Sequence, residues 1–201
     1  MSESWPAPVR WIHWTSAALL ALAVPAALLA QALMETRTDA AEALISTHIL
    51  AGLALLVLTT ARISARIVFA RPSALPGPAW LQIARGLRSA VFYALLCALP
   101  ITGILKLTLS GFDVSAFGVT LLPAGVPVLP LARALSRTHE VLAYLLIALA
   151  LLHSGAALLG RREALVRMWP SRALSEKGSE SREENAITWR REPIPSRRKR
   201  L

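Results

Sequence analysis

The chain has 201 residues, of which 55% are hydrophobic and 17% are charged, and its formal net charge is +10. A mean hydropathy of +0.51 excludes an ordinary water-soluble domain. The aromatic content of only 6% argues against a membrane β-barrel. The composition therefore predicts an all-α membrane protein, and its single cysteine, Cys97, excludes an intramolecular disulfide.

Four apolar runs are each long enough to cross a hydrocarbon core of about 30 Å, which takes roughly 20 helical residues. We expect them to form a transmembrane four-helix bundle within a domain of residues 1–170. The first run resembles a cleavable signal peptide, but it is longer than a signal core, so we expect it to stay in the protein. The four runs cover about residues 11–34, 43–63, 90–109 and 139–159.

Three connections and a tail complete the chain. Residues 71–78 are rich in proline, and residues 80–88 are expected to lie along the membrane surface. Residues 110–130 hold three glycines and three prolines, which predicts an irregular loop or a short re-entrant turn. Residues 171–201 are polar, and four consecutive basic residues precede the last residue. This composition predicts a disordered basic cytoplasmic tail.

Basic residues are concentrated in the second connection and after the fourth run, whereas the first connection is mainly acidic. By the positive-inside rule, both termini are expected to face the cytoplasm. This distribution explains the net charge as membrane topology and argues against a nucleic-acid partner. Arg66 and Arg71 of the second connection are expected only to snorkel toward the membrane surface.

All four histidines lie inside or at the mouth of an apolar run, where an ionisable side chain marks a functional site. His48 and His139 both enter from the outer surface, on different helices, and can meet. His153 follows His139 by fourteen residues, which is about 21 Å and close to four helical turns. His153 therefore reaches the depth of His13 on nearly the same face, and we expect two histidine pairs, one near each membrane surface.

Two neutral imidazoles on facing helices are a suitable axial ligand pair for a six-coordinate haem iron. The residue four positions after each histidine is small, as at Gly52, and leaves room for a porphyrin. Zinc, the rival metal, usually takes four ligands at one point, so two separated pairs disfavour it. The chain has no Cys-x-x-Cys-His motif, which excludes covalent c-type attachment.

Haem carries two propionates, and buried propionates need cationic partners. Arg62 follows His48 by fourteen residues, again about four turns, which places it near the cytoplasmic pair. Arg10 precedes His13 by about one turn. Both arginines are candidate propionate partners, and Lys106 is either a partner of the outer haem or one more snorkelling residue.

Several short segments occur in an order and spacing typical of one family. They are Trp11–Trp14, His48–Gly52 running on to Arg62 and Ile63, Tyr93 through Pro100–Gly103, and His139 and Glu140 with the later His153. In these segments the chain resembles the bacterial cytochrome b-561 family, small four-helix proteins of the inner membrane. The resemblance covers about residues 7–170. It implies two b-type haems, held by His13 with His153 toward the cytoplasm and by His48 with His139 toward the periplasm.

The resemblance also implies single-electron transfer between a periplasmic or membrane donor and ubiquinone. One branch similar to this chain oxidises superoxide, which would make the protein a superoxide:ubiquinone oxidoreductase. However, the outer segments carry balanced charges, without an obvious electropositive funnel. The alternative is a docking subunit of a separate dehydrogenase or hydrogenase, against which the short outer loops argue mildly.

The quinone pocket has no clear sequence pattern. Tyr93, Lys106, Trp14 and Trp80 are candidate linings, but each is more simply explained as a packing residue or an interfacial anchor.

Overall fold

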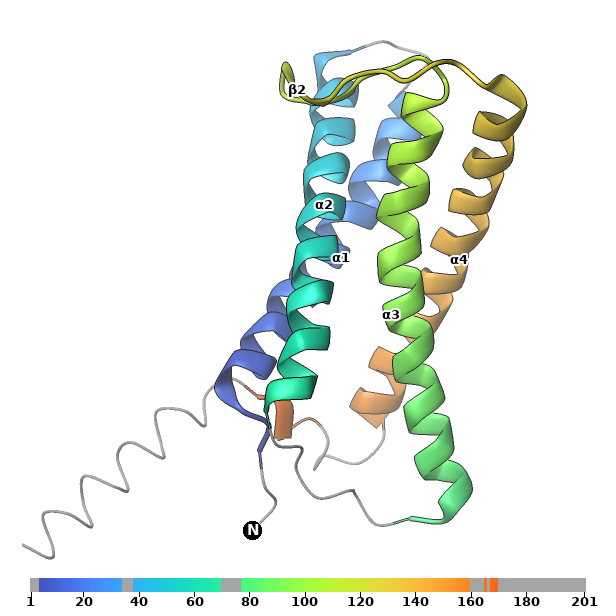
Figure 1. Ribbon diagram of the computed structural model, residues 1–201. Coiled ribbons are helices and arrows are strands. Elements are labelled where there is room, and N and C mark those ends of the chain that lie inside the picture. Colours follow the sequence, from blue (N-terminus) through green and yellow to red (C-terminus); the bar gives the residue numbers. More distant parts are fainter. Residues whose placement is uncertain (1–3, 34–37, 70–76, 160–164, 166, 170–201) are drawn as a thin grey trace, which may run out of the picture.

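The computed structural model describes residues 4–33, 38–69, 77–159, 165 and 167–169. All four long helices among these residues are long and apolar enough to cross a membrane, which confirms the expected all-α, four-helix architecture (Figure 1). The predicted tail, residues 171–201, lies outside the described residues. The elements in chain order are α1 (Ala7–Leu33), α2 (Asp39–Val68), α3 (Ala79–Thr108), β1 (Val114–Ala116), β2 (Val119–Leu122) and α4 (Leu129–Leu159).

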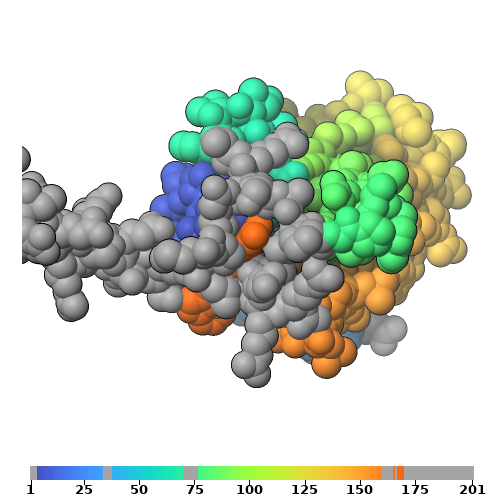
Figure 2. Space-filling model, turned by 90° about the horizontal axis from the view of Figure 1, so that it is seen from below, coloured from blue at the N-terminus to red at the C-terminus, as the bar shows by residue number. Residues whose placement is uncertain are grey.

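The helices run alternately up and down, with α1 packed along α2 and α3 packed along α4. The segment after α4 returns to the start of the chain, where the Trp5 N–H donates a hydrogen bond to the Arg167 carbonyl, 3.2 Å away. We call this end of the bundle the N-terminal end and the opposite one the hairpin end. Figure 2 looks onto the N-terminal end, where the starts of α1 and α3 and the ends of α2 and α4 meet.

The side chains are distributed as a lipid environment requires. Large apolar residues such as Val57 face outward, and this valine is 68% exposed. Buried hydroxyls bond to their own helix, as Thr59 Oγ1 does by donating to the Leu55 carbonyl at 2.6 Å. An apolar core lies at mid-height, and its Leu146 is seven residues from both His139 and His153. The buried members of this core are Leu55, Leu95, Leu96 and Leu146.

All four helices begin earlier than hydropathy predicted, and the difference is largest for α3 and α4. α3 starts at Ala79, so residues 80–88 belong to the spanning helix and do not form a separate surface segment. α4 starts at Leu129, and His139 therefore lies inside this helix and not at its beginning. Prolines at both starts, Pro78 and Pro130, suit a first helical turn, where a missing N–H costs no hydrogen bond.

The connection between α3 and α4 contains a β-hairpin, which corrects the prediction of an irregular loop or a short re-entrant turn. β1 and β2 pair antiparallel, with Ala116 opposite Val119. Phe117 and Gly118 form the turn between them, and both have positive φ angles, 48° and 78°. Positive φ at both positions is the geometry of a type I′ turn, which matches the twist of paired strands. The Phe117 N–H donates to Ser46 Oγ of α2 at 3.0 Å and fastens the hairpin to the bundle.

Candidate cofactor site

The four histidines lie in two pairs, each joining helices that are distant in sequence. At the N-terminal end, His13 of α1 and His153 of α4 have ring centres 6.3 Å apart, with planes at 85°. At the hairpin end, His48 of α2 and His139 of α4 have ring centres 6.2 Å apart, with planes at 81°. α4 contributes one histidine to each pair, as the spacing of fourteen residues predicted.

The separation of the rings suits a metal ion between them. A metal–imidazole bond is about 2 Å long, and each ring nitrogen lies about 1 Å from its ring centre, so two axial imidazoles have centres about 6 Å apart. Edge-to-face ring contacts fall in the same distance range. The hydrogen bonds of the ring nitrogens are therefore the more informative observation.

At the hairpin end, backbone carbonyls orient both rings. His48 Nδ1 lies 2.9 Å from the Ala23 carbonyl, and His139 Nδ1 lies 3.0 Å from the Leu99 carbonyl. Because a carbonyl can only accept, each Nδ1 must carry the proton, which leaves Nε2 as the nitrogen with a free lone pair. This is the usual arrangement of a metal-binding histidine, whose other nitrogen donates to a carbonyl or carboxylate.

A second contact fixes the His139 ring. Thr102 Oγ1 lies 3.1 Å from His139 Nδ1 and donates to the Ala98 carbonyl at 2.8 Å. A Cβ atom at Gly103 would come within 3.2 Å of His139 Cε1, so the absence of a side chain there gives the ring its place. Sequence reasoning did not identify these positioning contacts, although the resemblance had included Thr102 and Gly103 as part of a motif.

At the N-terminal end, aromatic rings hold the histidines. The Phe92 ring centre lies 5.4 Å from that of His153, and the Trp14 ring centre lies 5.6 Å from that of His13. Trp14 Nε1 in turn donates to the Met168 carbonyl at 2.7 Å. His153 Nδ1 is buried and has no hydrogen-bond partner within the described part of the chain. A polar ligand or water could satisfy this nitrogen.

Buried arginine nitrogens occur at this end of the bundle. Arg10 is only 3% exposed, and among the described residues its Nε and Nη1 have no hydrogen-bond partner, nor does Arg62 Nε. Arg62 lies within electrostatic range of both His13 and His153. The carboxylates of the described residues all lie at the opposite, hairpin end of the bundle: Asp39, Glu42, Asp113 and Glu140.

Unpaired buried guanidinium groups beside a histidine pair are suited to bind carboxylates that the described chain does not supply. The residues at this end therefore fit a cofactor that carries carboxylates, as haem does. At the hairpin end, Lys106 is partly buried and lies within electrostatic range of His139.

Comparison with known proteins supports a haem protein. A family model described as prokaryotic cytochrome b561 matches residues 4–171. The chain belongs to this family. It is also 31% identical over 131 residues to cytochrome b561 homolog 1 of Escherichia coli (strain K12). This match covers 63% of the chain and 74% of that relative. The protein is thus a prokaryotic membrane b-type cytochrome that binds haem b and takes part in electron transfer.

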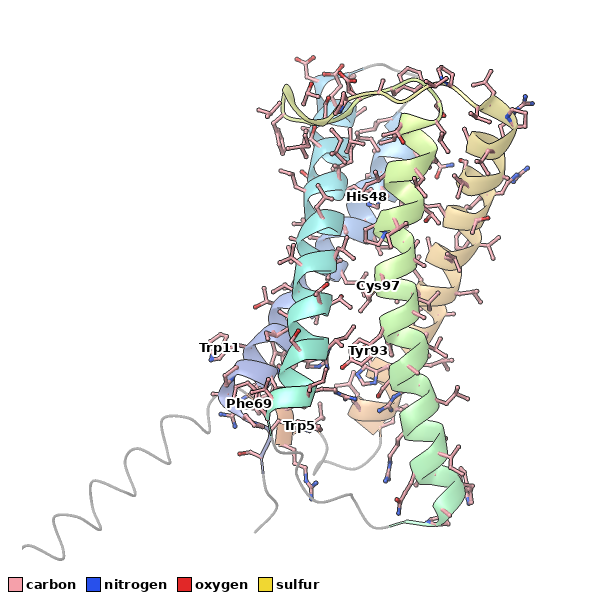
Figure 3. The ribbon with its side chains drawn as sticks, viewed as in Figure 1. Trp5, Trp11, His48, Phe69, Tyr93 and Cys97 are labelled. Atoms are coloured by element: carbon pink, nitrogen blue, oxygen red, sulfur yellow. The ribbon has the colours of Figure 1, made fainter. Side chains whose placement is uncertain are left out.

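Three other residues that the sequence analysis discussed remain to be located in the cytochrome. Trp80 is 68% exposed at the start of α3, as an interfacial anchor would be. Arg66 differs from a residue that only snorkels, because its guanidinium carbon lies 5.5 Å from the Trp5 ring centre and 5.3 Å from that of Tyr93 (Figure 3). Arg71 lies outside the described residues.

Gly52 of the cytochrome allows the porphyrin prediction to be tested. A Cβ atom at Gly52 would meet no described atom within 4 Å, and the same holds at Gly86 of α3. We expect Gly52→Leu to lower the haem-to-protein ratio, because the new side chain would occupy porphyrin space, while Gly86→Leu should leave the ratio unchanged. The ratio is measured from the visible spectrum, and equal haem loss in both variants would argue against a porphyrin beside Gly52.

Proposed function

We propose that this cytochrome b561 holds two haems, with His13 and His153 as axial ligands of one and His48 and His139 as those of the other. The observation that carries this proposal is the pairing of the histidines at two levels about 21 Å apart along α4. Haem iron held by these histidines would supply one-electron chemistry. The protein binds, spaces and tunes the two groups.

Each half of the protein would contribute in a different way. Carbonyls at Ala23 and Leu99 orient the ligands of the hairpin-end pair, and Gly52 leaves space beside His48. Arg10 and Arg62 would hold the propionates at the N-terminal end and raise the positive potential there. The leucine core between the two levels excludes water from the region between the pairs.

The membrane orientation follows from the charges at the two ends. The described N-terminal end carries many arginines, whereas the described carboxylates lie at the hairpin end. By the positive-inside rule, we propose that the N-terminal end faces the cytoplasm, in keeping with the predicted cytoplasmic location of both termini. The His48–His139 pair then lies toward the periplasm. The arginines in question are Arg10, Arg62, Arg66, Arg85, Arg88 and Arg167.

We further propose that electrons pass from a periplasmic or membrane donor, with superoxide as the first candidate, to ubiquinone. A quinone needs hydrogen-bond donors for its carbonyl oxygens. Arg66 Nε is buried and has no hydrogen-bond partner in the described ranges. The buried Tyr93 hydroxyl, which interacts with the Arg62 side chain, lies on the facing helix at the N-terminal end. These two groups are therefore the proposed donors to the quinone.

The experiment that tests this function uses the purified full-length protein. We expect a low-spin b-type visible spectrum with two haems per chain. We also expect superoxide to reduce a water-soluble ubiquinone analogue in the presence of the protein, measured as a loss of quinone absorbance. Two haems without this activity, together with a second polypeptide that copurifies in mild detergent, would support the docking-subunit alternative. A colourless protein would contradict the proposal entirely.

A further inference from the structure

The connection at the hairpin end is unusually apolar for a segment outside the spans. No charged residue occurs between Asp113 and Arg133. Phe117 is 60% exposed and Val119 is 61% exposed, although neither residue belongs to a membrane-spanning helix. A loop bathed in water would normally present polar or charged side chains, so this surface needs a partner.

The hairpin has two chemically different faces. Ala116 is 4% exposed and is paired with Val119, so these two side chains point to the same side of the hairpin, toward α2. Ser115 is paired with Thr120, and their hydroxyl oxygens lie 3.4 Å apart on the other side. The apolar face thus turns toward the bundle and the hydroxyl face turns away from it.

The turn reaches sideways past α2 (Figure 1). Val119 therefore keeps its exposure while it points in the same direction as the buried Ala116.

The depth of the hairpin matches the membrane boundary. α2 has 30 residues and is about 45 Å long, which exceeds a hydrocarbon core of about 30 Å by roughly 7 Å at each end. The Ser46 hydroxyl that binds the Phe117 N–H lies seven residues, or about 10 Å, below the start of α2. The hairpin turn is therefore held at the level where headgroups meet the hydrocarbon.

The distribution of aromatic residues points to the same role. The described tryptophans all lie at the N-terminal end, whereas membrane proteins usually have aromatic anchors at both interfaces. At the hairpin end, two phenylalanines are exposed: Phe117 in the turn of the hairpin and Phe112 just before its first strand. The tryptophans in question are Trp5, Trp11, Trp14, Trp80 and Trp169.

We propose that the hairpin is an interfacial anchor, whose Phe117 and Val119 side chains insert into the phospholipid leaflet at the hairpin end. The occupant of the apolar face is the bilayer, because the face points toward it and lies at its boundary. The anchor would hold the bundle at a fixed depth and keep water from the nearby His48–His139 level. This role does not depend on which donor or acceptor the cytochrome uses.

The test measures the surroundings of single positions in vesicles of phosphatidylethanolamine and phosphatidylglycerol. In a Cys97→Ala background, single cysteines replace Phe117, Val119 or Thr120 and carry a nitroxide label. Val57→Cys provides the lipid-facing reference. Power saturation then compares collisions with oxygen, which partitions into lipid, and with a nickel chelate, which stays in water.

We expect the labels at positions 117 and 119 to collide more with oxygen than with nickel, as at position 57. The matched label at position 120, one residue away on the opposite face, should favour nickel several-fold. Equal nickel access at positions 119 and 120 would overturn the proposal, because the hairpin would then lie in water. Protection of position 119 from both reagents would also overturn it, because a protein and not lipid would cover the face.

Discussion

Replacement of His153 by alanine is expected to lower the haem content from two per chain to one. The variant removes one imidazole of the N-terminal-end pair, and His13 alone supplies a single axial nitrogen. The pair formed by His48 and His139 keeps both rings and their carbonyl partners. The measurement is a haem-to-protein ratio from the visible spectrum of a pyridine haemochrome.

Two controls make this result specific. Ser154→Ala changes an exposed residue next to His153 on α4 and should keep both haems. His139→Ala should also leave one haem, but a different one, so the two single variants should differ in their reduction potentials. Loss of both haems from a folded His153→Ala protein, with its helical circular dichroism unchanged, would contradict two independent sites.

Removal of the Arg62 charge is expected to make the N-terminal-end haem harder to reduce. Reduction adds one negative charge, and Arg62 lies within electrostatic range of both histidines of this pair. Unit charges about 10 Å apart interact by roughly 1–2 kcal/mol at an effective dielectric constant of about 20. We therefore expect Arg62→Gln to lower the reduction potential by on the order of 50 mV, measured by a redox titration of the visible spectrum.

The conservative variant separates charge from geometry. Arg62→Lys keeps the positive charge but loses the planar fork, so its potential should lie closer to the wild type than that of Arg62→Gln. The potential of the other haem should change little in either variant, because His48 lies about four turns away along α2. Identical shifts in both variants, or equal shifts of both haems, would show that Arg62 does not act through its charge on the nearer haem.

The spans and the depths of the histidines could be predicted because both depend on one continuous stretch of chain. Hydropathy identifies a span, and helical rise converts the interval between His139 and His153 into a distance and a face. The helix starts at Ala79 and Leu129 were missed because these helices continue beyond the hydrocarbon core, where hydropathy no longer distinguishes helix from loop.

The hairpin was hidden for a related reason. Its strands have only three and four residues, and the prolines and glycines around them are typical of a loop. What stabilises the turn is the contact between Phe117 and Ser46 of α2, seventy-one residues apart in sequence. A contact of this kind has no local pattern.

Composition and spacing were sufficient to predict a membrane bundle and four histidines at two levels, because helical geometry is nearly the same in every sequence. The packing of the helices decided which carbonyls orient His48 and His139, and that Arg66 lies between Trp5 and Tyr93. Those contacts depend on the rotation of each helix about its axis and on the residues of its neighbours. Such rotations are set by the summed packing of several helices, so they arise only when the whole bundle is assembled.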